Sequence, residues 1–230
     1  MQNDHPILAT DRQTLTQPHF ITLEGIEGSG KTTQIARLVG FLEDRGFECV
    51  TTRQPGGTLI GESIRSILLD PANRNLEPSA ELLLYMADRA QHIHELIRPC
   101  LKVGKTVVCD RYYDATLVYQ GFARGLSIEL IQNLHHLLFD DLKPDVTLLL
   151  DLPPQLGLER AWEQLNTGQR SGQESRFEAE KIAFHEKVRA GYLELALLEP
   201  DRIRVIDAAP PPDQVFADIS KIVSALFIKP

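Results

Sequence analysis

The clearest chemical signal in the sequence is a glycine-rich segment near its start. Residues 25–32 read Gly-Ile-Glu-Gly-Ser-Gly-Lys-Thr and fit the pattern G-x-x-x-x-G-K-[ST] at every fixed position. In such a loop the backbone N–H groups surround a phosphate at the N-terminus of a helix, and the lysine reaches the β- and γ-phosphates. The threonine hydroxyl completes a Mg²⁺ shell. The sequence therefore predicts an ATP site with these contacts: Gly25, Ile26, Glu27, Gly28, Ser29, Gly30, Lys31, Thr32 and Thr33.

The rest of the chain restricts the class of P-loop protein. A GTPase would need an Asn-Lys-x-Asp motif to read guanine, and the sequence has no Asn-Lys pair. The formal net charge is −8, from 24 Lys and Arg against 32 Asp and Glu, whereas an ATPase that acts on nucleic acid would normally carry a positive stripe. Residues 163–175 are polar and contain glycine, which is typical of a surface loop or of a mobile lid. A lid favours a kinase of small molecules, which must exclude water from its substrates.

Three further segments could hold the phosphate acceptor. Arg53 stands where a predicted strand runs into a Pro-Gly-Gly turn, and open α/β sheets bind ligands at the carboxyl ends of their strands. Tyr85 and Arg89 would share one helical face, so that a base could stack on the ring while the guanidinium donates to a base carbonyl. Asp110 and Arg111 end an apolar strand, where they could hold metal and neutralise phosphate charge. The plainer alternatives are a solvated arginine, a core tyrosine beside an unrelated arginine, and a structural Asp–Arg pair.

The elements that must position these residues follow from the hydrophobic pattern. Apolar runs of strand length occur at Phe20–Glu24, Phe47–Arg53, Thr106–Asp110, Val146–Asp151 and Ile203–Asp207. Most of them are nearly continuous, which is typical of strands buried on both faces of a parallel sheet. Apolar residues at helical spacing lie between them, among others over residues 79–98, 128–139 and 177–199. This alternation predicts an α/β fold with a parallel sheet covered by helices.

Taken together, the motifs resemble the thymidylate kinases of bacterial type, which are P-loop kinases of a nucleoside monophosphate. The agreement in order and spacing runs from Phe20 to about Phe227. It includes residues 20–34, Thr-Arg-Gln-Pro-Gly-Gly-Thr at 52–58, Arg-Ala-Gln at 89–91, Asp-Arg-Tyr at 110–112, Tyr-Gln-Gly at 119–121 and Arg-Phe-Glu at 176–178. The resemblance implies a three-layer P-loop NTPase fold with a five-stranded sheet. It also implies transfer of the γ-phosphoryl group of ATP to dTMP, giving dTDP and ADP for dTTP synthesis, by a homodimer that uses Mg²⁺.

The resemblance further implies roles for individual residues. Lys31, Asp110 and Arg111 act in catalysis, and Thr32 and Asp110 hold the metal. The residues that bind dTMP are Glu27 at the sugar and its 3′-hydroxyl, Arg53 and Arg111 at the phosphate, Tyr85 stacked on thymine, Arg89 at a base carbonyl, Thr116 and Gln120 near the base edge, and Tyr119 against the ribose 2′ position. The sequence departs from the bacterial pattern at Gln54, where glutamate is common.

One catalytic arginine is expected in the lid, at about residues 163–176. The P-loop itself has no arginine before its lysine, and in family members of this type a lid arginine binds the phosphate instead. Arg170 is the first choice because it lies within the polar loop, and Arg160 and Arg176 flank it as alternatives.

Composition indicates the organisation and surroundings of the chain. Residues 1–18 are predicted to be a flexible N-terminal extension and residues 19–230 a single kinase domain. The three cysteines lack metal-ligand spacing, and no apolar stretch approaches the ~20 residues that span a membrane. A cytoplasmic protein without a membrane or nucleic-acid partner is expected. Two rival functions remain open, a kinase of another nucleotide or metabolite and an ATP-binding regulatory domain without turnover.

Overall fold

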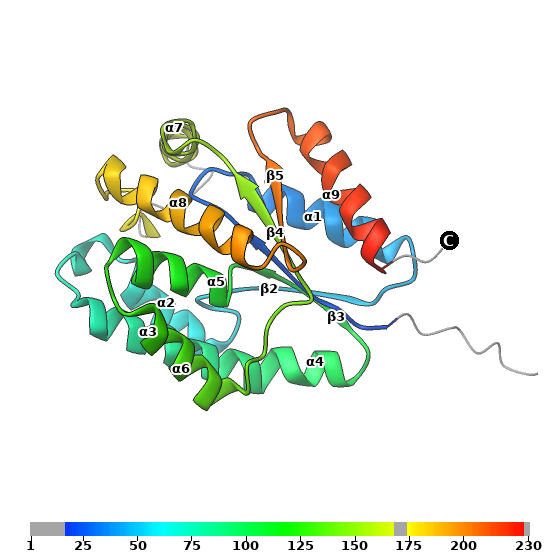
Figure 1. Cartoon of the computed structure of the whole chain (residues 1–230), viewed down its shortest axis with the longest axis horizontal. Helices are drawn as coiled ribbons and strands as arrows, with labels where there is room; N and C mark the ends of the chain where they lie inside the picture. The colour runs from blue at the N-terminus through cyan, green and yellow to red at the C-terminus, as the bar shows by residue number, and fades with distance from the viewer. Residues whose placement is uncertain (1–16, 168–173, 228–230) are drawn as a thin grey trace, which may run out of the picture.

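The computed structural model describes residues 17–167 and 174–227, which pack around a parallel β-sheet (Figure 1). Its strands are β1 (Phe20–Glu24), β2 (Cys49–Arg53), β3 (Thr106–Asp110), β4 (Val146–Asp151) and β5 (Ile203–Asp207), in the order β2-β3-β1-β4-β5. Four strands have the predicted bounds. The second begins at Cys49 instead of Phe47, because the N–H group of Phe47 donates to Leu42 O (3.2 Å) in the turn that ends the preceding helix.

Helices cover both faces of the sheet and complete the three layers of a P-loop NTPase fold. Their bounds are α1 (Lys31–Glu43), α2 (Leu59–Leu69), α3 (Pro78–His92), α4 (Arg98–Lys102), α5 (Tyr113–Thr116), α6 (Ile128–Phe139), α7 (Pro154–Asn166), α8 (Ile182–Leu198) and α9 (Pro212–Phe227). Helices α1 and α9 pack together on one face, and α3, α4, α5, α6 and α8 lie on the other (Figure 1). Among the described residues, no helix combines the length and apolar character that a membrane crossing requires.

Two predicted helices have different bounds in the structure. The pattern over residues 79–98 is divided between α3, a π-helical turn at Ile93–Ile97, and α4. Residues 176–179 form turns, so α8 begins at Ile182 instead of near residue 177. In these turns Arg176 and Phe177 are buried, so they pack inward instead of extending the helix.

The carboxyl edge of the sheet brings together polar residues that are far apart in the sequence. Asp110 of β3 is in register with Leu23 of β1 and with Arg53 of β2. Because the strands are parallel, the loop after β1 starts at this same edge. Strand register therefore places the glycine-rich loop, Arg53 and Asp110 around one space.

Candidate active site

The loop between β1 and α1 wraps around its own lysine. Lys31 Nζ donates to Gly25 O (3.2 Å) and to Ile26 O (3.1 Å). Gly28 has a φ of 71°, and a Cβ atom there would overlap the carbonyl group of Gly157 in α7. Glycine alone satisfies both conditions, so α7 can pack directly against the loop.

A cavity of about 460 Å³ opens above this loop. Of the nine residues predicted to contact ATP, those from 27 to 33 line this cavity. Gly25 and Ile26 do not line it and instead supply the carbonyl groups that accept hydrogen bonds from Lys31. The seven are Glu27, Gly28, Ser29, Gly30, Lys31, Thr32 and Thr33. The local geometry is that of a phosphate-binding loop.

The floor of the cavity carries groups of both charges. Burial and the nearby Arg111 lower the pKa of Lys31 to about 8, although Asp110 and Glu27 oppose this shift. Ser29 Oγ and Asp110 Oδ1 are buried, and neither has a hydrogen-bond partner within the described part of the chain. A phosphate oxygen would accept from the serine hydroxyl, and a hard cation such as Mg²⁺ would suit the carboxylate.

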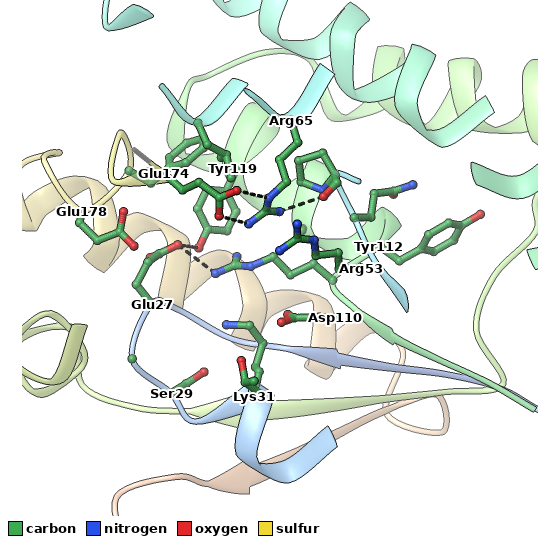
Figure 2. A pocket seen from close by; sticks show the side chains of 18 of the residues that line it. Glu27, Ser29, Lys31, Arg53, Arg65, Asp110, Tyr112, Tyr119, Glu174 and Glu178 are labelled. Carbon is green, nitrogen blue, oxygen red and sulfur yellow. Dashed lines mark hydrogen bonds and ion pairs between the residues drawn. The ribbon is translucent and has the colours of Figure 1, made fainter. Parts of the chain in front are cut away.

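Glu27, a residue of the P-loop, lines the cavity and points toward the side that carries its arginines (Figure 2). Its Oε1 atom accepts hydrogen bonds from Arg111 Nη2 (2.9 Å) and from Tyr119 OH (2.8 Å), and His185 Nδ1 lies 3.3 Å from its Oε2 atom. Burial alone would raise the pKa of Glu27, but Arg111 and His185 hold it well below its usual range. Glu27 is therefore an anion that holds Arg111 and Tyr119 in fixed positions.

Two arginines face the cavity opposite the P-loop, as Figure 2 shows. Arg53 forms an ion pair with Glu62 (Nη2 to Oε2, 2.9 Å) and remains partly exposed. Arg65 donates twice to Glu174, from Nε (2.8 Å) and Nη2 (2.7 Å), and once to the carbonyl oxygen of Pro55. With Arg111, these side chains add three guanidinium groups to the Lys31 ammonium group that lines the same cavity, in an otherwise acidic protein.

Of the residues predicted to contact the base, Tyr85 and Gln120 line the cavity, whereas Arg89 and Thr116 are buried and do not line it. Arg89 is fully buried and donates to Gln54 Oε1 (2.8 Å), Tyr112 O (3.1 Å) and Thr116 Oγ1 (2.6 Å). Its Nη1 group has no partner among the described residues. Gln54 therefore supplies an acceptor for Arg89, and the Nη1 group of Arg89 remains for a group outside the described residues.

The three candidate lid arginines differ in how the structure uses them. Arg170 lies outside the described residues. Arg160 donates to the carbonyl oxygens of Ala208 and Ala209 (both 3.1 Å). Arg176 is buried, donates to Leu68 O, and pairs with Glu81 (Nη2 to Oε2, 2.6 Å). Arg160 and Arg176 thus already have protein partners.

A second cavity, of about 590 Å³, adjoins the first at the P-loop. Both are lined by Gly28, Ser29, Gly30, Thr33 and Gln164, and the second extends to Arg160 and to residues 208–212 between β5 and α9. The glycine-rich loop therefore faces two connected spaces, as a reaction between two bound molecules requires.

Sequence reasoning missed several polar residues of this region. Arg65 and Glu174 are 109 positions apart, and neither belongs to a motif. His185 lies on the buried face of α8 with Phe184 and Val188, where the helical pattern predicts only core. Glu81 had a usable signal, because it is four residues before Tyr85 and so lies on the face of α3 that carries Tyr85 and Arg89.

Comparisons with known proteins point to one family. A family model described as thymidylate kinase matches residues 23–219. The thymidylate kinase of Desulfosudis oleivorans is 59% identical over 196 residues, covering 85% of this chain and 92% of the relative. The thymidylate kinase of Desulforapulum autotrophicum is 58% identical over 200 residues, covering 87% and 88%. Among solved structures, a thymidylate kinase from Ehrlichia chaffeensis has a TM-score of 0.71 and 33% sequence identity, covering 90% of this chain and 98% of its own.

Proposed function

The chain belongs to the thymidylate kinase family, and on that premise we propose how its residues perform the family reaction. The enzyme transfers the γ-phosphoryl group of ATP to dTMP, giving dTDP and ADP. The observation that carries the assignment of the site is that Lys31, Asp110 and Arg111 line the same cavity as the acceptor-side residues Arg53 and Tyr85.

In this proposal the two cavities hold the two substrates. The triphosphate of ATP lies on the P-loop, with its nucleoside in the cavity that reaches residues 208–212. The acceptor dTMP occupies the other cavity, with its phosphate between Arg53 and Arg111 and its base against Tyr85. Both phosphates then meet above Lys31, which fits an in-line transfer between two bound nucleotides.

Phosphoryl transfer here depends on positioning and charge. The attacking atom is a phosphate oxygen of dTMP, which is already largely ionised near pH 7, so the reaction needs no strong general base. Two anions must nevertheless approach each other. Lys31, Arg111 and Arg170 supply the positive charge that stabilises the transferred group.

Glu27 and Tyr119 define the sugar end of the acceptor site. Glu27 is ionised and faces the cavity, so it can accept a hydrogen bond from the sugar 3′-hydroxyl. Tyr119 is held by its hydrogen bond to Glu27 (2.8 Å) and packs against Phe177 with 5.3 Å between ring centroids. A ring fixed in this way crowds the ribose 2′ position and favours deoxyribose.

Mg²⁺ is proposed as the cofactor, held by the Thr32 hydroxyl and Asp110 together with phosphate oxygens of ATP. The unpartnered Asp110 Oδ1 atom supports this site. Few protein ligands suffice, because Mg²⁺ in kinases usually takes only one or two from the protein and completes its shell with water and phosphate. When bound, the ion neutralises charge on the β- and γ-phosphates.

We also propose how the chain is organised and how it assembles. Residues 19–230 act as one kinase domain, and two copies form a homodimer. The exposed leucines Leu83 on α3 and Leu137 on α6 support an interface on these helices, since they are 63% and 75% exposed. Three free cysteines in the described residues support a reducing, cytoplasmic compartment.

The experiment that tests the function is ADP release from Mg-ATP with dTMP, dUMP, dGMP, AMP, UMP and CMP as separate acceptors. A strong preference for dTMP is expected. Turnover with a different monophosphate would keep a P-loop kinase but discard the base pocket. A folded chain that binds ATP and turns over none of these acceptors would instead favour the regulatory alternative.

A further inference from the structure

Directly behind the acceptor cavity lies a buried carboxylate that the proposed reaction does not use. Glu81, in the first turn of α3, is fully buried and does not line the cavity. Its Oε1 atom accepts a hydrogen bond from Gln120 Nε2 (2.7 Å), and its Oε2 atom accepts one from Arg176 Nη2 (2.6 Å). Arg124 Nε lies 3.5 Å from Oε1. Two guanidinium groups thus neutralise Glu81, and both of its oxygens are bonded.

The hydrogen bond between Gln120 and Glu81 can have only one polarity. An ionised carboxylate accepts hydrogen bonds and cannot donate them, so the NH₂ end of the Gln120 amide must face Glu81. The carbonyl oxygen is at the other end of the same planar group. Gln120 lines the acceptor cavity, and its Oε1 atom is bonded to none of the described residues. The group that Gln120 offers to a bound base is therefore a fixed acceptor.

Such an acceptor distinguishes pyrimidines by the protonation of one ring nitrogen. Thymine and uracil carry an N–H group at N3, which can donate to Gln120 Oε1. Cytosine has a lone pair at N3, and this would face the lone pairs of the carbonyl oxygen. If the amide could turn over, its NH₂ group would suit cytosine instead.

We propose that Glu81 is a positioning residue that makes the site select thymine or uracil over cytosine, by fixing the orientation of the Gln120 amide. The inference rests on the proposed function, in which Gln120 lies near the base edge. A buried ion pair adds little to stability compared with well-packed apolar side chains. A role in specificity accounts for its presence beside the base pocket.

The test is the E81Q variant, whose neutral amide can donate as well as accept and so permits both orientations of Gln120. Isothermal titration calorimetry without ATP gives the dissociation constants of dTMP and dCMP. We expect the preference for dTMP over dCMP to fall about tenfold, because the Gln120 amide could then turn its NH₂ group toward the N3 lone pair of cytosine. A preference that stays within twofold of wild type would overturn the proposal.

Because E81Q also removes the charge opposite Arg176, a second variant is needed in case the first does not fold. E81D keeps that charge but withdraws the acceptor from Gln120 by one methylene group, and the same loss of preference is expected. Arg124→Gln is the matched control, because it changes the surroundings of Glu81 and leaves the Gln120 hydrogen bond in place. An equal loss of preference in this control would assign the effect to a loosened core and overturn the proposal.

A double-mutant cycle shows whether Glu81 acts through Gln120. In a Gln120→Leu background, E81Q should change the preference less than twofold, and a persisting tenfold change would contradict the inference. The wild-type chain separates this inference from the proposed function. A chain that prefers dTMP over dCMP but releases no ADP would overturn the reaction and support the base selection. A chain that transfers phosphate but binds both nucleotides equally would overturn the inference alone.

Discussion

At the scale of single residues, Lys31 has two roles. It closes the P-loop by donating to two of its carbonyl groups, and it is the cation at the floor of the cavity. We expect Lys31→Ala to lower kcat about 10²–10³-fold or more, by analogy with the loss of one preorganised group that stabilises a transition state.

Steady-state ADP release and circular dichroism check this prediction together. Lys102→Ala, on an exposed position of α4, is the matched control and should leave both unchanged. Normal turnover by a folded Lys31→Ala variant would contradict the assignment of the P-loop.

Tyr85 is the residue on which recognition of the base depends most in our proposal. Tyr85→Ala should raise the KM for dTMP about 5- to 150-fold, because base–aromatic stacking contributes about 1–3 kcal/mol. Tyr85→Phe retains the ring and should stay near wild type. Equal KM values for all three proteins would remove Tyr85 from the base pocket.

Arg170 is the arginine that we propose for the lid. Arg170→Ala should lower kcat roughly 10³–10⁵-fold, because an arginine finger contributes about this much to the rate. The affinity for dTMP should change little. Rapid-quench measurement of single turnovers would report the chemical step directly. A loss below tenfold would move the role to Arg160 or Arg176, both of which have other partners in the structure.

At the scale of elements, the buried face of α3 contacts the turn after β2 and carries Tyr85, which lines the cavity. Asp88 on this face accepts a hydrogen bond from the N–H group of Gly56 (2.9 Å) and so connects α3 to the turn after β2. Burial raises the pKa of Asp88 to about 7, although the bond from Gly56 and the charge of Arg89 oppose the shift. The raised pKa means that the folded chain binds more protons than the unfolded chain between about pH 4 and 7.

The free energy of unfolding should therefore fall as the pH rises through this window, with a slope of at most about 1.4 kcal/mol per pH unit. Asp88→Asn keeps the acceptor for Gly56 and removes the titration. Its gain in thermal midpoint over wild type should be absent near pH 4 and largest above pH 7. Thermal unfolding monitored by circular dichroism at several pH values would show this, and a gain independent of pH would contradict it.

Elements also separate what the sequence predicts well from what it does not. The P-loop and the strands can be predicted from short stretches of sequence, because a buried parallel strand needs only a short apolar run. Four of the five strands have the predicted bounds. Hydrogen bonds between Arg65 and Glu174, or between Arg176 and Glu81, join residues 109 and 95 positions apart. Such pairs depend on tertiary packing, which periodicity does not encode. The prediction that Arg89 donates to a base carbonyl remains untested. Such a bond would have to come from Nη1, the guanidinium nitrogen that has no partner among the described residues.

At the scale of the whole molecule, the proposed dimer predicts a dependence on surface apolar residues. Leu83, Leu137 and Leu138 are exposed by 63%, 75% and 58% on α3 and α6. Sedimentation velocity should show a dimer for the wild-type chain and a monomer for Leu137→Glu. Leu226→Glu, on the exposed side of α9, is the control and should remain dimeric. A monomeric wild-type chain would contradict the proposal.

The strand order determines when β1 can pair with its neighbours while the chain is being synthesised. The strand that supports the P-loop, β1, lies between β3 and β4, and it is complete at residue 24 while β4 is complete only at residue 151. The interval of 151 − 24 = 127 residues corresponds to roughly 6–25 s at 5–20 residues per second. Throughout that time, β1 lacks at least one of the two strands, β3 and β4, that flank it in the folded sheet. Early in synthesis, the apolar residues Phe20, Ile21 and Leu23 of β1 therefore lack the neighbouring strands that bury them in the folded chain.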